Sequence, residues 1–136
     1  MMRVLFDTNI VLDVLLNREP FVTEAKALWE ANDDGRLTGY ISASSLTDIF
    51  YVARRIAGVE AARTAVRVCL DAFEICEIDR PVLEYAYSLA GTDFEDDLQI
   101  ACAHFADIGA IVTRDKTGFS GSPVLAATPG EVLSKL

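Results

Sequence analysis

The chain has 136 residues, enough for a single domain over residues 1–136 with a substantial core, and its 51% hydrophobic and 24% charged residues are typical of a globular protein. No apolar stretch approaches the roughly 20 residues of a membrane span, and the first residues do not resemble a signal peptide, so we expect a cytoplasmic protein without a membrane segment. The net charge of −9 argues against a nucleic-acid binder held mainly by its overall field, whereas contacts through a metal ion or a local basic patch remain compatible with it.

Apolar runs of strand length alternate along the chain with longer segments whose apolar residues recur at helical spacing. Strands are predicted at residues 3–6, 37–41, 73–78, 110–113 and 124–127. Helices are predicted at residues 9–16, 23–31, 44–57, 61–72, 80–89, 93–105 and from 129 onward. This alternation predicts an α/β fold in which helices flank a mainly parallel sheet.

Small polar residues and glycines mark several helix ends. Thr23 is expected to cap the second helix, and Ser44 or Ser45 the third. Asp93 is expected to cap the acidic helix that follows Gly91, which in turn is expected to end the preceding helix.

The cysteines and the histidine do not indicate a metal site or a catalytic triad. Cys69, Cys76 and Cys102 lie in apolar or helical patterns without metal-ligand spacing, so we expect buried, reduced thiols. The single histidine, His104, excludes histidine-rich metal sites and makes a serine–histidine triad a poor explanation.

Aspartates occur where predicted strands end or where the following helices begin. Asp7 ends the first strand, Asp48 lies early in the helix after the second, and Asp115 follows a late strand. Asp96 and Asp97 lie in the first turn of the acidic helix. Because the carboxyl ends of parallel strands meet at one edge of a sheet, we expect these distant carboxylates to converge there.

Such convergence has a large electrostatic cost. Two like charges ~4 Å apart repel by roughly 4 kcal/mol at an effective dielectric constant of 20, whereas a whole domain is stable by only about 5–15 kcal/mol. A divalent cation relieves the repulsion, and oxygen-only ligands favour Mg²⁺ or Mn²⁺ over zinc. Sites of this kind suit the hydrolysis of phosphodiesters.

Each acid also has a purely structural explanation. Asp7 could cap the helix that follows it, and Asp48 could complete a capping box with the serine three residues before it. Asp93 could serve only as a cap, and Asp115 only as a turn residue. For Asp97 a solvated charge is a better explanation than a supporting acid.

Three segments resemble the motifs of a known family. Residues 4–9, which read VLFDTN, resemble the opening of PIN domains. Residues 96–103 are similar to their third acidic motif, and residues 112–115, followed by Phe119, to their fourth. The resemblance covers essentially the whole chain, and among single-domain proteins of this size it is to the VapC toxins of toxin–antitoxin pairs.

The resemblance implies a PIN-like three-layer α/β/α domain that acts as a Mg²⁺- or Mn²⁺-dependent endoribonuclease. It also implies an RNA substrate and an antitoxin protein as partners, and it leaves open whether two copies form a homodimer. Carried over to this sequence, it makes Asp7, Asp96 and Asp115 the metal ligands, directly or through water. Asp48 becomes the remaining catalytic acid. Because that position is commonly glutamate, the shorter Asp48 requires a closer helix or an intervening water.

Further roles are implied around these acids. The auxiliary groups are Asn9, Asp93, Asp97 and Thr113. The candidates for contacts with RNA phosphates are Arg18, Arg54, Arg55, Arg114 and Lys116. A solvated helix face explains Arg54 and Arg55 equally well, and so little basic surface argues against tight nonspecific RNA binding. The family itself favours a structured RNA such as a tRNA.

Apolar residues on the early helices could form a groove for an antitoxin or a dimer surface. These residues are Leu12, Leu15, Leu16, Trp29 and Tyr51. Burial in the core is the better explanation for Leu12 and Leu15.

Three other functions stay open. A phosphoacceptor signalling domain would carry a pair of acids after the first strand, whereas Asp7 is followed by Thr8 and Asn9. A phosphatase with an aspartate nucleophile would carry aspartate at position 9. A PIN domain without activity could serve as a binding module.

Overall fold

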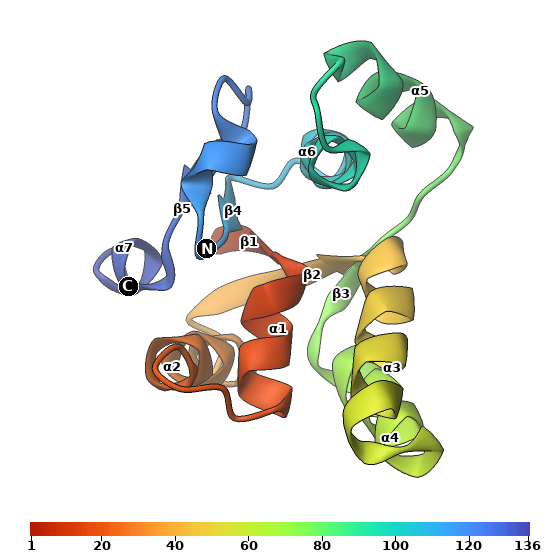
Figure 1. Ribbon diagram of the computed structural model, residues 1–136. Coiled ribbons are helices and arrows are strands. Elements are labelled where there is room, and N and C mark those ends of the chain that lie inside the picture. The colour runs from red at the N-terminus through yellow and green to blue at the C-terminus, as the bar shows by residue number, and fades with distance from the viewer.

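The computed structural model describes all 136 residues and contains one five-stranded sheet (Figure 1). The strands are β1 (Met2–Phe6), β2 (Leu37–Ser42), β3 (Glu74–Cys76), β4 (Ala110–Val112) and β5 (Leu125–Ala127). All neighbouring strands are parallel, in the order β3-β2-β1-β4-β5. The parallel α/β arrangement that the sequence predicted is therefore confirmed.

Seven α-helices and one short 3₁₀ helix connect the strands. They are α1 (Thr8–Leu15), α2 (Val22–Asp33), α3 (Ala43–Ala57), α4 (Val59–Ala72), α5 (Arg80–Leu89), α6 (Phe94–Phe105), the 3₁₀ helix η1 (Lys116–Phe119) and α7 (Pro129–Leu133). In Figure 1, α5 and α6 lie on one side of the sheet, and α1, α2, α3 and α4 lie on the other. None of the helices combines the length and the apolar character that crossing a bilayer requires.

The alternation of side chains along β1 explains why helices cover both faces of the sheet. Val4 and Phe6 belong to a core shared with α1 to α4 and α7, whereas Leu5 belongs to a second core shared with α5 and α6. All three side chains are completely buried. A central strand buried on both faces makes the sheet a rigid base for the loops at its carboxyl edge.

The register of the central strands brings distant segments together. In β1, Leu5 lies opposite Ile111 of β4, and the next residue, Phe6, lies opposite Val112. The amide of Asp7 donates to the carbonyl of Val112 at 3.0 Å, which extends this pairing one step beyond β1. The residues after β1 and after β4 therefore emerge side by side.

Three helix ends differ from the sequence prediction. Thr23 does not cap α2, which begins one residue earlier without a side-chain cap. The cap of α3 is Ser42 rather than Ser44 or Ser45, because the Ser42 Oγ accepts a hydrogen bond from the amide of Ser45 at 3.3 Å. The hydroxyl of Ser45 instead lies 2.8 Å from that of Thr8, which links α3 to α1.

The end of α5 also differs. Ala90, rather than Gly91, takes the left-handed conformation that closes α5, with a φ of 54°. The proposed Gly91 cap is therefore wrong, and Gly91 serves a different purpose, because a Cβ at this position would collide with the carboxylate of Asp97. The three cysteines are free and buried, as expected.

The buried centre of β4 gives a direct test of this arrangement. Ile111→Ala is expected to lower the free energy of unfolding by about 2–5 kcal/mol, because the side chain is 0% exposed and its removal leaves a cavity. Urea denaturation followed by circular dichroism measures the loss. The matched control is Leu125→Ala on β5, which is 56% exposed and should cost less than about 1 kcal/mol. Equal losses at the two positions would contradict the proposed core.

Candidate active site

A hollow of about 320 Å³ opens at the carboxyl edge of the sheet beside β1 and β4. Asp7, Asp96 and Asp115 line it together, although they come from three segments distant in sequence. Asn9 and Thr113 complete its polar wall. The convergence expected from the parallel sheet is thus present for these three acids.

Asp7 occupies the N-cap position of α1, but its side chain makes no capping hydrogen bond. Its Oδ1 instead accepts from the Nε2 of Gln99 on α6 at 2.9 Å, and its Oδ2 accepts from the Oγ1 of Thr113 at 2.8 Å. The carboxylate is therefore oriented from two directions by side chains outside its own helix. Thr113, expected to be an auxiliary group, thus contacts the first acid of the sequence.

Sequence reasoning did not single out Gln99. The side chain is buried within the run of apolar residues that faces the core from α6. A buried amide must find hydrogen-bond partners, so a glutamine inside an apolar helix face was the available signal.

Asp96 reaches the hollow because another residue caps its helix. Asp93 caps α6, with its Oδ1 accepting from the amides of Glu95 at 3.0 Å and Asp96 at 3.3 Å, as predicted. Asp96 then lies against Gly118 of η1, where a Cβ would collide with its Oδ2. Glycine at position 118 thus allows η1 to approach the carboxylate.

Asp115 serves both as a turn residue and as part of the hollow. Its Oδ1 accepts hydrogen bonds from the Oγ1 of Thr117 at 2.6 Å and from the amide of Thr117 at 2.9 Å, which starts η1. These two bonds hold the pKa of the Asp115 carboxyl below its ordinary value. Its Oδ2 makes no hydrogen bond within the protein, and the residue lines the hollow.

The interpretation of Asp97 as a solvated charge is wrong. Its side chain is buried, and its Oδ2 accepts from the amide of Gly91 at 2.9 Å. The carboxylate therefore fixes the turn between α5 and α6. It does not line the hollow that Asp7 and Asp115 share.

Asp48 stands apart from the three converging acids. It lies in α3, half-buried, and is not part of the wall of the hollow. Because Ser42 caps this helix, the proposed capping box of Asp48 with Ser45 is wrong. The side chain lies instead beside Glu95 of α6.

Glu95 is an acidic residue that sequence reasoning passed over. Burial, the charge of Asp48 and a hydrogen bond with Asp48 raise the pKa of Glu95 to about 7, with smaller contributions from Asp93 and Asp7. The acidic cluster thus extends from the hollow toward α3. The signal was present in the sequence, since Glu95 directly precedes Asp96.

The acids of the hollow are mutually repulsive. The pKa of Asp96 is raised to about 6, mainly by burial. Neighbouring negative charges raise it further, in the order Asp93, Asp7, Asp97 and Asp115. No group of three histidine, cysteine or acidic side chains is arranged closely enough to form a complete metal-binding cluster. Any cation here would therefore have one or two protein ligands and would take the rest from water or substrate, which is how Mg²⁺ is usually bound.

The candidate basic residues lie in different parts of the structure. Arg114 lines the hollow, whereas Lys116 pairs with Glu131 at 2.9 Å. Arg54 and Arg55 are exposed in the last turn of α3, the end that points away from the carboxyl edge of the sheet (Figure 1). The structure does not bring these two arginines to the acids.

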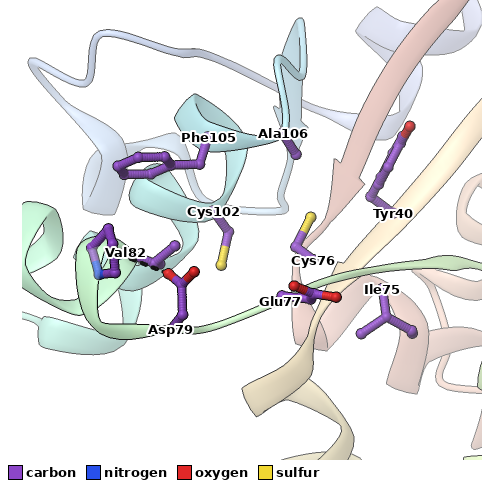
Figure 2. Close-up of a pocket in the computed structure, with 10 residues that line it drawn as sticks. Tyr40, Ile75, Cys76, Glu77, Asp79, Val82, Cys102, Phe105 and Ala106 are labelled. Atoms are coloured by element: carbon purple, nitrogen blue, oxygen red, sulfur yellow. Dashed lines mark hydrogen bonds between the residues drawn. The ribbon is translucent and has the colours of Figure 1, made fainter.

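A second hollow of about 380 Å³ lies between β2 and β3 on one side and α5 and α6 on the other (Figure 2). Its walls are mostly apolar, and the carboxylate of Asp79 is used to cap α5. Burial raises the pKa of Cys76 to about 12 and that of Cys102 to about 11, so neither thiol is a nucleophile near neutral pH. The smaller, acidic hollow is therefore the better candidate for chemistry.

Comparisons with known proteins identify the family of the chain and its fold. A family model described as PIN domain matches residues 3–117. A toxin–antitoxin complex from Klebsiella pneumoniae contains a chain 25% identical to this one, with a TM-score of 0.70 over 93% of this chain and 97% of that one. VapC20 from Mycobacterium tuberculosis, described as a sarcin-ricin loop cleaving toxin, is 18% identical, with a TM-score of 0.74 over 93% and 99%. DNA-bound VapBC from Salmonella typhimurium contains a chain that is 16% identical, with a TM-score of 0.71 over 95% of this chain and 99% of that one. No curated protein matches the chain.

The chain belongs to the PIN domain family, since the family model covers most of its length. Its three-layer fold is that of the VapC toxins, which confirms the resemblance drawn from the sequence motifs. The strand order also argues against a phosphoacceptor signalling domain, because such domains arrange their strands in the order 2-1-3-4-5.

The crowding of acids predicts that, in metal-free solution, the folded protein loses stability as the pH rises. The pKa of Asp96 is raised from 3.8 to about 6 and that of Glu95 from 4.5 to about 7, so the folded protein binds these protons more tightly than the unfolded chain. Their contribution to stability is present at low pH and is lost as the pH rises through this window. Asp96→Asn should therefore melt above the wild type at about pH 8, and this advantage should vanish near pH 4.

Thermal melting in EDTA measures the difference between the two proteins. Asp71→Asn is the matched control, because Asp71 is exposed on α4 and pairs only with Arg67. A lower melting temperature for Asp96→Asn than for the wild type at about pH 8 would show that Asp96 is not under repulsion.

Proposed function

We propose that the protein is a Mg²⁺- or Mn²⁺-dependent endoribonuclease that hydrolyses RNA phosphodiester bonds as the toxin of a toxin–antitoxin pair. The observation that carries the proposal is the convergence of Asp7, Asp96 and Asp115 in one hollow at the carboxyl edge of a PIN-type sheet. All three offer oxygen ligands, and burial together with the charges of neighbouring acids raises the pKa of Asp96. A divalent cation is the natural complement of such a site.

Asp7, Asp96 and Asp115 would hold the cation directly or through water. When bound, Mg²⁺ or Mn²⁺ would activate water and stabilise the charge that develops on the phosphate. Gln99 and Thr113 fix the orientation of Asp7 before any ligand arrives. Such pre-organisation matters because supporting groups around metal ligands commonly change activity by about 10–100-fold.

The toxin role draws on the structural relatives. The solved structures with this fold include a described ribosomal RNA-loop cleaving toxin and toxin–antitoxin complexes. RNA is accordingly the proposed substrate and an antitoxin the proposed partner. The side chains considered for an antitoxin groove contribute little to this proposal, because Leu12 and Trp29 are buried in the core and, of the five, only Tyr51 is mostly exposed.

Cleavage of a labelled structured RNA, such as a tRNA, tests the enzyme. The wild type should cut in Mn²⁺ or Mg²⁺ and not in EDTA, and Asp7→Asn or Asp96→Asn should slow cleavage by more than about 100-fold. Thr113→Val, which removes only a supporting hydroxyl, should slow it by about 10–100-fold. Asp71→Asn should cut at the wild-type rate. Absence of cleavage with every metal and RNA tried would leave an inactive binding module as the function.

Metal binding has an independent readout. Adding Mn²⁺ should raise the melting temperature of the wild type, because the cation binds only the folded site. Asp96→Asn should show a smaller rise, whereas Asp71→Asn should behave as the wild type. An equal rise in all three proteins would place the bound metal elsewhere.

The antitoxin is testable by co-expression with the product of the adjacent reading frame. A partner that co-purifies with the protein and suppresses its RNA cleavage would support the toxin role. A neighbour that neither binds nor inhibits would limit the proposal to the nuclease alone.

A further inference from the structure

One carboxylate of the structure is completely buried. Asp13 of α1 is 0% exposed, and its two oxygens face two different arginines. The Nε of Arg18 lies 3.1 Å from Oδ1, and the Nε of Arg114 lies 3.1 Å from Oδ2. A charge in this position would be strongly destabilising without such partners. Asp13 therefore ties the end of α1 to the residue between Thr113 and Asp115.

The two arginines approach Asp13 through the inner ends of their guanidinium groups. Both Nε atoms are buried, while the side chains of Arg18 and Arg114 keep 35% and 28% exposure. The outer nitrogens of both groups are thus left without a carboxylate. One outer nitrogen of Arg18 makes only a long contact, donating to the Oδ1 of Asn9 at 3.4 Å.

One of the two arginines lines the acidic hollow, and the other reaches a residue of its wall. Arg114 is part of its wall, and Arg18 contacts Asn9, which is also part of that wall. The guanidinium of Arg114 additionally stacks over the ring of Phe21, 4.0 Å from its centre. Contacts with Asp13 and Phe21 together restrict the rotation of Arg114 before any ligand binds.

The charge balance distinguishes this group from the other ion pairs. Arg36, Arg67, Arg80 and Lys116 each have one acidic partner, so those pairs are neutral. Arg18 and Arg114 share one aspartate, so the group keeps one net positive charge. Beside an otherwise acidic hollow, this group is the part of the site that favours an anionic ligand.

We propose that Arg18 and Arg114 form a binding site for a phosphate of the RNA strand next to the phosphodiester bond that is cut, and that Asp13 is the positioning residue of this pair. The inference rests on the proposed ribonuclease function. Guanidinium groups bind phosphate through several directed hydrogen bonds, and arginines already held in place lose less entropy when they do so. The site would hold the strand against the repulsion of the acids beside it.

The first experiment measures binding without cleavage. Asp96→Asn serves as the inactive parent, and fluorescence anisotropy follows a labelled single-stranded oligoribonucleotide in Mg²⁺. Adding Arg18→Gln or Arg114→Gln should raise Kd at least about tenfold. Each should also reduce the slope of log Kd against log salt concentration by about 0.7, the value for one lost phosphate contact on a single strand. Arg67→Gln, from an exposed pair on α4, is the matched control and should change neither quantity.

The second experiment separates positioning from folding. Three single variants are made in the otherwise wild-type enzyme: Arg18→Gln, Arg114→Gln and Asp13→Asn. Each should raise KM for the same RNA severalfold and leave kcat near the wild-type value, because substrate binding alone is weakened. A purely structural role would lower the melting temperature without this split between KM and kcat. If Asp13→Asn fails to fold, the two arginine variants decide, since each leaves Asp13 with one cationic partner.

The outcomes distinguish this inference from the proposed function. Cleavage by the wild type, combined with an unchanged Kd and salt slope in both arginine variants, would overturn the phosphate site and leave the nuclease intact. No binding of RNA by the parent and no cleavage by the wild type would overturn both.

Discussion

The structure depends on keeping together carboxylates that repel one another. Asp7, Asp96 and Asp115 meet because strands β1 and β4 are hydrogen-bonded neighbours and α6 packs over them. Burial and the charges of neighbouring acids raise the pKa of Asp96. Two buried cores on opposite faces of β1 supply the opposing stability. The hydrophobic packing extends up to the acids, since Phe6 and Val112 are fully buried at the ends of β1 and β4.

Three kinds of contact leave the acids of the hollow free from structural roles such as helix capping. Asp93 caps α6, which frees Asp96 from that task, and Gln99 and Thr113 hold the carboxylate of Asp7 away from the amides of its own helix. Gly118 removes the Cβ that would block Asp96. Asp115 both starts η1 through its Oδ1 and lines the hollow. The acidic hollow is therefore a product of its supporting residues as much as of the acids themselves.

The fold and the three converging acids could be predicted because they follow from strand-length apolar runs and from the shared edge of parallel strands. Side-chain contacts between separate segments could not be predicted from these patterns. The burial of Asp97 depends on how α5 turns into α6, and the pairing of Asp48 with Glu95 depends on how closely α3 approaches α6. Asp13 looked like one polar residue in an amphipathic helix, since its arginine partners are five and about a hundred residues away in the chain. The cap of α3 was misplaced by two or three residues because neighbouring serines compete for the same role.

The strand order has a consequence for when the site comes into existence. Strand β1 is made first, but its neighbour β4 begins at Ala110, and the hydroxyl that holds Asp7 follows only at position 113. A growing polypeptide that has reached the end of α6 already contains most of the acids and Gln99, but it still lacks β4 and the hydroxyl of Thr113, which hold the first of them. The complete acidic hollow therefore requires the last third of the chain, because both β4 and Asp115 must be present beside the earliest strand.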